Sequence, residues 1–220
     1  MSFLLGYVPY QMWAEADPRV MCMLQTSLRS FRHELLVANF AGVPVLQQHG
    51  SADSNVPAFH SRRMNQLVSP SAKDTSHDYS ELEGRGHWYD GVMTSLPLRK
   101  FYANLLGVGG EPKLPQTFSI VVSNPADMGP RGGLVVDQMI TPDQLGKIDI
   151  AMNPTTATWV LRTSNIRRFH FSSAGYNPLP HELIIDETQL ELPLEKVESG
   201  CWLLRSRIGI WQVSIMSPEC

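Results

Sequence analysis

The chain has 220 residues, 43% of them hydrophobic and 18% charged, a composition typical of a globular protein with one large or two small domains. Its formal net charge of −3 does not indicate the basic surface that nucleic-acid binding requires. There is no apolar run of about 18 residues, so neither a membrane-spanning helix nor a membrane partner is expected. Three distant cysteines form no CxxC pair, so no metal or cofactor is expected, and the compartment stays undetermined.

Residues 1–108 alternate between helix-like and strand-like patterns. Apolar side chains recur near a period of 3.6 over residues 17–36, where Pro18 suits the first helical turn. A strand is predicted at residues 43–48, a helix at 55–68, a second strand at 78–83 and a helix at 91–106. A polar loop is predicted at residues 70–78. This order predicts a parallel sheet with helices on its faces, and therefore an α/β domain.

The pattern changes after Leu106. Glycines and prolines in residues 107–116 indicate a boundary, with a linker at residues 109–116. Residues 117–220 predict a small all-β domain of unknown role, a sandwich or a barrel, because short β-rich runs alternate there with turn signals. The predicted strands are residues 117–123, 133–140, 147–152, 158–162, 165–171, 182–186, 201–205 and 208–214.

Aromatic residues recur through this β-rich region. Such residues are more often core than binding surface, but a binding face is the open alternative. They are Trp159, Phe169, Phe171, Tyr176, Trp202 and Trp211.

Asp53 and His87 are the candidate catalytic residues. Asp53 follows the first predicted strand, after His49-Gly50, and His87 follows the next strand in Gly84-Arg85-Gly86-His87. Their order and spacing, with room for one helix and one strand, place two strand-end loops side by side. An acid followed by a histidine is the order of the last two members of an α/β-hydrolase triad. The sequence therefore predicts a hydrogen bond between these two side chains.

Other polar residues compete for these roles. Asp90 follows His87 closely, but Asp53 has the better position at a strand end. We expect His49 to pack or bond locally and His60 to be structural within its helix. The remaining candidates are expected to be surface groups, namely His33, Glu34, His77, Asp78 and Glu83.

Two stretches resemble the catalytic domain of the prolyl oligopeptidase family of serine peptidases, an α/β-hydrolase branch. They are PVLQQHGSADSNVPAFHSRRMNQLV (residues 44–68), with an HGxxDxxVP core, and YSELEGRGHWYDGVM (residues 79–93). The chain is similar to large fungal-type members over the C-terminal part of the catalytic domain, and residues 158–171 are similar to the β-rich extension that follows. The resemblance implies Asp53 as the acid, His87 as the base and a peptide or ester as the substrate.

The family's nucleophile lies in a Gly-x-Ser-x-Gly turn upstream of the acid. Residues 1–48 contain no such motif, and Ser27 and Ser30 lie in a helical pattern without glycines. We therefore expect a piece of a longer enzyme with little activity by itself, because triad residues act as a unit. Two alternatives remain: an inactive remnant with a β-rich binding or interaction module, or an esterase that uses the same triad. The oligomeric state is open.

Overall fold

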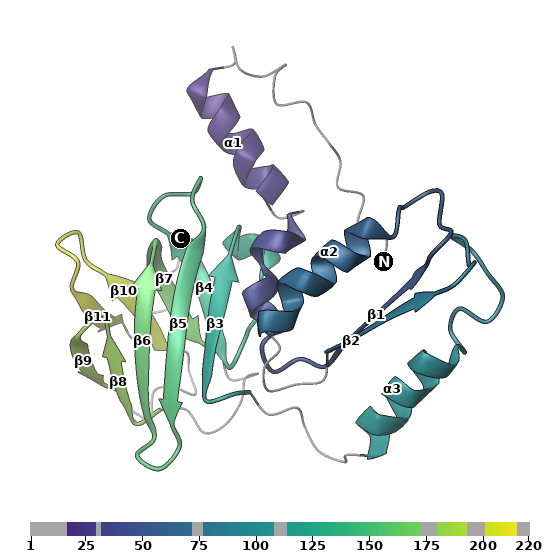
Figure 1. Cartoon of the computed structure of the whole chain (residues 1–220). Helices are drawn as coiled ribbons and strands as arrows, with labels where there is room; N and C mark the ends of the chain where they lie inside the picture. Colours follow the sequence, from purple (N-terminus) through teal and green to yellow (C-terminus); the bar gives the residue numbers. More distant parts are fainter. Residues whose placement is uncertain are drawn as a thin grey trace. The chain divides into compact units, whose positions relative to one another are not determined.

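The computed structural model describes residues 17–29, 32–71, 77–107, 114–172, 180–192 and 201–214. Within these ranges it is a mixed α/β structure with three α-helices and three sheets (Figure 1). The chain divides into two compact units. We call residues 40–115 the βα unit, and residues 17–39 together with those from Gln116 onward the β-rich unit. No helix in the described ranges is long and apolar enough to cross a membrane.

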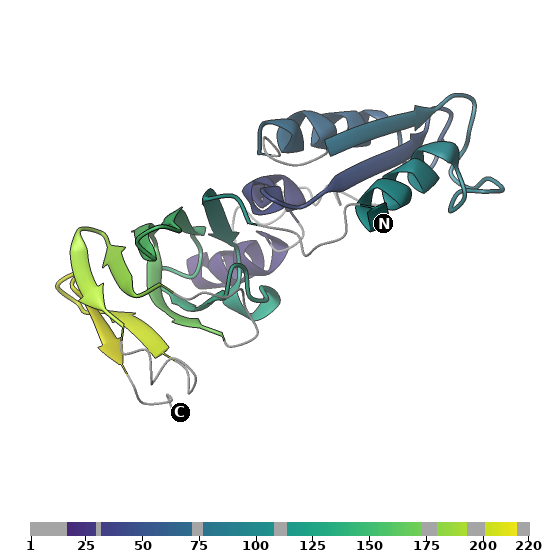
Figure 2. The ribbon, with the colours of Figure 1, turned by 90° about the horizontal axis from the view of Figure 1, so that it is seen from below.

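The βα unit is built on a two-stranded parallel sheet. In chain order it contains β1 (Val45–Gly50), α2 (Phe59–Val68), η4 (Ser69–Ser71), β2 (His77–Leu82) and α3 (Leu96–Gly107). The two strands pair in parallel from Val45 opposite His77 to Gly50 opposite Leu82. Helices α2 and α3 lie on opposite sides of this sheet (Figures 1 and 2). The predicted parallel pairing with intervening helices is confirmed.

Both helices of the βα unit begin later than the sequence predicts. Helix α2 begins at Phe59, because the Asp53 carboxylate accepts the backbone N–H of Asn55 and Val56 and so holds the preceding residues in a turn. Helix α3 begins at Leu96, since the hydroxyl of Ser95 accepts the backbone N–H of Leu98 as an N-cap. Residues 72–76 of the predicted polar loop lie outside the described residues.

The β-rich unit has two larger sheets. The five-stranded sheet has the order β3-β5-β6-β8-β9, with only β6 and β8 parallel, and the antiparallel four-stranded sheet has the order β11-β10-β7-β4. The strands are β3 (Thr117–Val122), β4 (Leu134–Met139), β5 (Gly146–Asn153), β6 (Thr158–Ser164), β7 (Ile166–Phe171), β8 (Glu182–Ile185), β9 (Thr188–Glu191), β10 (Cys201–Arg205) and β11 (Trp211–Ser214), with η5 (Pro125–Asp127) after β3.

The two sheets share one apolar core. Alternate residues of β5 and β6 are buried, as expected for strands with one covered face. Trp159 of β6 meets Phe171 of β7 edge to face at 5.9 Å between ring centroids, and Phe169 meets Trp211 at 5.3 Å. All four rings are buried, so the predicted core role is confirmed for them. Trp202 is only partly buried, and Tyr176 lies outside the described residues.

Strand β8 was predicted from the sequence, but β9, its partner in a hairpin, was not. The two turn residues of the hairpin, Asp186 and Glu187, have φ of 46° and 72°, the left-handed conformation of a two-residue type I′ turn. The Asp186 carboxylate holds this turn in place, because it accepts the backbone N–H of Thr163 at 2.7 Å and the indole N–H of Trp211 at 2.9 Å. Glycine or asparagine usually marks such turns, so the local signal was absent.

The single helix predicted over residues 17–36 is wrong, because the described residues between 17 and 39 form shorter helical elements. The segment contains α1 (Pro18–Arg29) and two short 3₁₀ turns, η2 (His33–Leu35) and η3 (Val37–Phe40). The side-chain amide of Asn39 donates to the Val121 carbonyl and accepts the Val121 N–H, both at 2.8 Å. These bonds to β3 group the segment with the β-rich unit, whereas the sequence analysis placed it in a domain spanning residues 1–108. Most of the predicted linker (residues 109–116) lies outside the described residues, namely residues 109–113.

Candidate active site

Asp53 and His87 lie in two loops at the carboxyl ends of β1 and β2. Parallel strands end at the same edge of a sheet, so the loops that follow them meet there. The Nδ1 atom of His87 lies 2.8 Å from Oδ2 of Asp53. The approach that the sequence predicts for these two side chains is confirmed, while their catalytic role stays a prediction.

The Asp53 carboxylate is held by bonds to both oxygens. Oδ1 accepts the backbone N–H groups of Asn55 and Val56, each at 2.9 Å, and the side chain is only 6% exposed. Burial raises the pKa of this carboxyl, but the hydrogen bonds from Val56, His87 and Asn55 outweigh burial and lower the pKa overall. Asp53 is therefore ionised at neutral pH and acts only as an acceptor.

An ionised partner fixes the proton of the imidazole. Because Asp53 can only accept, Nδ1 of His87 carries the hydrogen, and in the neutral ring Nε2 holds the lone pair. Within the part of the chain that the structure describes, Nε2 makes no hydrogen bond. The His87 side chain is 21% exposed, so this lone pair is available to a proton donor at the sheet edge.

Close backbone packing brings the two loops together. A Cβ atom at Gly50 would lie 2.3 Å from the Arg85 carbonyl oxygen and 2.5 Å from that of Gly86. The backbone N–H of Ala52 donates to the same Arg85 carbonyl at 2.9 Å, and that of Gly84 to the Ser51 hydroxyl at 2.8 Å. The glycine at the end of β1 is therefore a requirement of the site, because any side chain there separates the loops.

Gln48 anchors the loop that follows His87. Its amide nitrogen donates to the Tyr89 hydroxyl at 2.9 Å and to the Val92 carbonyl at 3.1 Å, and its amide oxygen accepts the Ser95 hydroxyl. One residue of β1 thus fixes both the His87 loop and the start of α3. Gln48 was not predicted as a site residue, because no local sequence pattern marks hydrogen bonds to residues more than 40 positions away.

His49 supports the acid from the other side. Its Nε2 lies 2.8 Å from the Val56 carbonyl oxygen, which only accepts, so Nε2 carries a hydrogen, and the Ser61 hydroxyl meets Nδ1 at 2.6 Å. The same Nε2 lies 3.3 Å from Oδ2 of Asp53. His49 bonds locally, as predicted, and it also steadies the carboxylate that holds His87.

A charged pair ties α2 to β2 beneath these loops. The Arg62 guanidinium donates two hydrogen bonds to Glu81, at 2.8 and 2.5 Å, and the Tyr79 hydroxyl donates a third at 2.7 Å. The bonds from Arg62 and then from Tyr79 lower the pKa of Glu81 to about 2. Glu81 is therefore ionised at all ordinary pH values.

The remaining sequence candidates have contacts or exposure of their own. His60 stacks against Phe59 in α2, with ring centroids 3.9 Å apart, and Nε2 of His77 lies 3.0 Å from the Gln47 amide nitrogen. Glu34 pairs with Arg32 at 2.9 Å. Asp78, Glu83 and Asp90 are exposed.

The geometry of the Asp53–His87 pair can support proton transfer. No described serine makes a hydrogen bond to His87, and Ser30 lies outside the described residues. No group of three or more His, Cys, Asp or Glu side chains in the described ranges is placed to hold a metal ion. Among the described residues, the arrangement is therefore an Asp–His pair with no serine hydroxyl bonded to the imidazole.

Comparison with known proteins gives one informative relative. The chain is 38% identical over 209 residues to a protein of Arthroderma benhamiae described as an "Uncharacterized secreted protein". The alignment covers 94% of this chain but 22% of that protein, so the chain spans about a fifth of its relative's length. No family model matches the chain. No solved structure matches it either.

Proposed function

We propose that Asp53 and His87 are the acid and the base of a serine hydrolase, a peptidase of the prolyl oligopeptidase type. The observation that carries the proposal is the 2.8 Å hydrogen bond from Nδ1 of His87 to Oδ2 of a buried carboxylate. In this arrangement Asp53 orients the ring and stabilises the imidazolium that forms during the reaction. The free Nε2 is the atom that exchanges a proton with the nucleophile.

The chemistry that this pair supports is acyl transfer. Nε2 of His87 takes the proton from a serine hydroxyl while the serine oxygen bonds to the substrate's carbonyl carbon. The imidazolium then gives that proton to the departing nitrogen or oxygen, which leaves an acyl-enzyme. Water repeats the two steps and releases the acid. An amide and an ester differ only in the leaving atom, so an esterase is the alternative outcome.

We propose that the nucleophile belongs to a part of a longer protein that this sequence does not include. The chain contains no Gly-x-Ser-x-Gly motif before Asp53, and it spans about a fifth of its Arthroderma relative. Since that relative is described as secreted, an extracellular location is part of this proposal.

The finer fold assignment follows from the same reasoning. We propose that the βα unit is the C-terminal half of an α/β-hydrolase sheet and that the β-rich unit is a sandwich-like extension. Strands of parallel sheets are usually covered on both faces, yet β1 and β2 keep intermediate exposure along their length. Further strands and helices of a longer protein would supply the missing cover.

A fluorophosphonate probe, which labels activated serines, tests the proposal. The 220-residue chain alone should not be labelled, while a longer protein with the upstream region should be. His87→Ala should abolish labelling, because the serine loses its base. His60→Ala removes a histidine from α2 of the same unit and should leave labelling intact.

Peptide and ester substrates then separate the two hydrolase classes. Strong labelling of the 220-residue chain would contradict the proposal, and so would a labelled longer protein that is indifferent to His87→Ala.

A further inference from the structure

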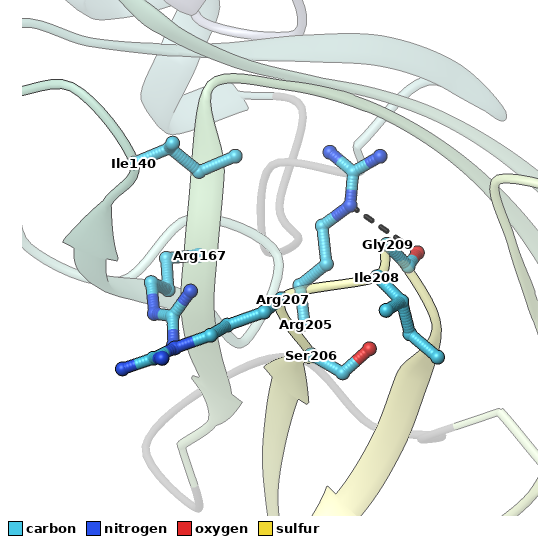
Figure 3. Close-up of a pocket in the computed structure, with 7 residues that line it drawn as sticks. All are labelled: Ile140, Arg167, Arg205, Ser206, Arg207, Ile208 and Gly209. Atoms are coloured by element: carbon cyan, nitrogen blue, oxygen red, sulfur yellow. Dashed lines mark hydrogen bonds between the residues drawn. The ribbon is translucent and has the colours of Figure 1, made fainter.

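The β-rich unit has an arginine-lined hollow far along the chain from Asp53 and His87. It has a volume of about 330 Å³, and its lining includes Arg167 of β7, Arg205 at the end of β10 and Arg207 in the turn before β11. Strands β7 and β10 pair side by side, with Leu204 opposite Arg168, so the register brings Arg205 next to Arg167. The fold thus places Arg167 at the same hollow as Arg205 and Arg207, which lie far from it in the sequence; the guanidinium of Arg205 points away from the other two (Figure 3).

No carboxylate in the described ranges forms an ion pair with these three arginines. The ion pairs of the β-rich unit involve other side chains, among them Asp137 with Arg168 and His170. Arg205 donates through Nε to the Gly209 carbonyl at 3.3 Å, which leaves its two terminal nitrogens for another acceptor. Figure 3 shows Arg207 extending toward the guanidinium of Arg167. Like charges that point toward one another favour an anion between them.

The residues between the arginines add a polar and an apolar contact. The Ser206 hydroxyl accepts the Ile210 N–H at 3.0 Å, so its own hydrogen is available to donate. Ile140 and Ile208 also line the hollow and are 49% and 82% exposed. A ligand that fits this lining carries a compact negative group together with an apolar body.

We propose that this hollow binds a phosphate or sulfate monoester. Arginine forks match the spacing of oxygens on a tetrahedral oxyanion, and each fork makes paired charge-assisted hydrogen bonds. The organic part of the monoester lies against Ile140 and Ile208. The volume is at the lower end of the range for small-molecule sites, roughly 300–1,000 Å³. The chain as a whole is acidic, so this cluster is a local feature and not a general basic surface.

Isothermal titration calorimetry of the 220-residue chain with phenyl phosphate, phenyl sulfate, inorganic phosphate and phenol tests the proposal. We expect saturable binding of one or both monoesters, tighter than that of inorganic phosphate, and none of phenol. Arg167→Gln and Arg207→Gln should each weaken binding at least fivefold. Arg162→Gln removes the same charge from an exposed position on β6 and should change affinity less than twofold.

A second measurement, NMR of the arginine side chains, uses the unmodified chain and so does not depend on the folding of a variant. The Nε–Hε resonances of Arg167, Arg205 and Arg207 in the unmodified chain should shift on titration with the bound monoester. Loss of binding in the Arg162 variant equal to that in the Arg207 variant would overturn the proposal, since the attraction would then be non-specific. Equal affinity for inorganic phosphate would overturn the assignment to a monoester, and unshifted arginine resonances would overturn the site.

Discussion

The two units of this chain differ in what they bury. Among the described residues, all but two of the buried apolar side chains lie in the β-rich unit, and the two exceptions are Ala58 and Val68. The β-rich unit has paired sheets and interlocking aromatic rings. The βα unit has a two-stranded sheet whose large apolar residues include exposed Trp88 and Leu106.

The unit with the larger apolar core is not the unit that contains the Asp53–His87 pair. Sheets of only two strands are marginal without further cover, whereas two facing sheets close a core of their own. Yet the βα unit holds the organised Asp–His pair, built from hydrogen bonds and a close glycine contact and not from a large core. The β-rich unit therefore holds most of the buried apolar core among the described residues, and the βα unit has little core of its own.

The largest effect should come from separating the units. Residues 116–220 expressed alone should be monomeric and melt cooperatively, because the buried side chains of both sheets come from this segment. Residues 40–115 should aggregate or dimerise, since uncovered apolar surface of several hundred Å² favours association. Light scattering and thermal melts of both segments check this. A monomeric 40–115 segment with a cooperative melt would show that the sheet is self-sufficient.

Truncating one large apolar side chain in each unit tests the same difference in burial. Phe169→Ala removes a fully buried ring that contacts Phe171 and Trp211, and it should reduce the free energy of unfolding by about 3–5 kcal/mol. Leu106→Ala, at an 83% exposed position of the βα unit, should stay within about 0.5 kcal/mol. Urea denaturation of the full chain measures both. A comparable loss at Leu106 would reveal a core that the structure does not contain.

The close approach at Gly50 gives a smaller effect that is local to the site. Gly50→Ala places a methyl group against two backbone carbonyls and should destabilise the βα unit by about 1–3 kcal/mol while separating Asp53 from His87. Gly86→Ala is the matched control, because a Cβ there meets nothing within 4 Å. Hydrogen exchange of the loop amides reports the difference. Equal protection in the two variants would contradict the observed loop packing.

Acid titration should give the smallest effect. The folded-state pKa of Glu81 is lowered from 4.5 to about 2, so the pair with Arg62 contributes stability above pH 4.5 that is lost as the pH falls toward 2. Glu81→Gln should therefore flatten the pH dependence of unfolding between about pH 5 and 2, with little change in the melting of the β-rich unit. An unchanged acid slope would mean that the pair adds nothing, as for many exposed ion pairs.

The sequence was informative where a local pattern carries the structure. Short β-rich runs between turn signals marked the strands of the β-rich unit, and glycines around a strand-end histidine marked the His87 loop. The missed strand β9 follows a turn at Asp186 and Glu187, and the turn residues adopt positive φ with the Asp186 carboxylate bonded to a neighbouring strand. The late helix starts depend on side-chain bonds from Asp53 and Ser95 to the backbone. Such tertiary contacts leave no periodic signal.

The contacts around Asp53 and His87 could likewise be predicted only in part from the sequence. The order of Asp53 and His87 predicted their contact, but the supporting bonds of Gln48 and the grouping of Asn39 with Val121 connect residues that are far apart in the chain. Polar contacts of this kind depend on the assembled sheets, and no spacing rule in the sequence encodes them.

The tautomer of His87 tests the central claim, that Asp53 orients this ring as a base. A long-range ¹H–¹⁵N correlation spectrum of the 220-residue chain, recorded with the ring neutral, distinguishes the two neutral forms. The account predicts a hydrogen on Nδ1 and a lone pair on Nε2, and it predicts that Asp53→Asn removes this preference. A hydrogen on Nε2 in the unmodified chain, or a tautomer indifferent to Asp53→Asn, would contradict it.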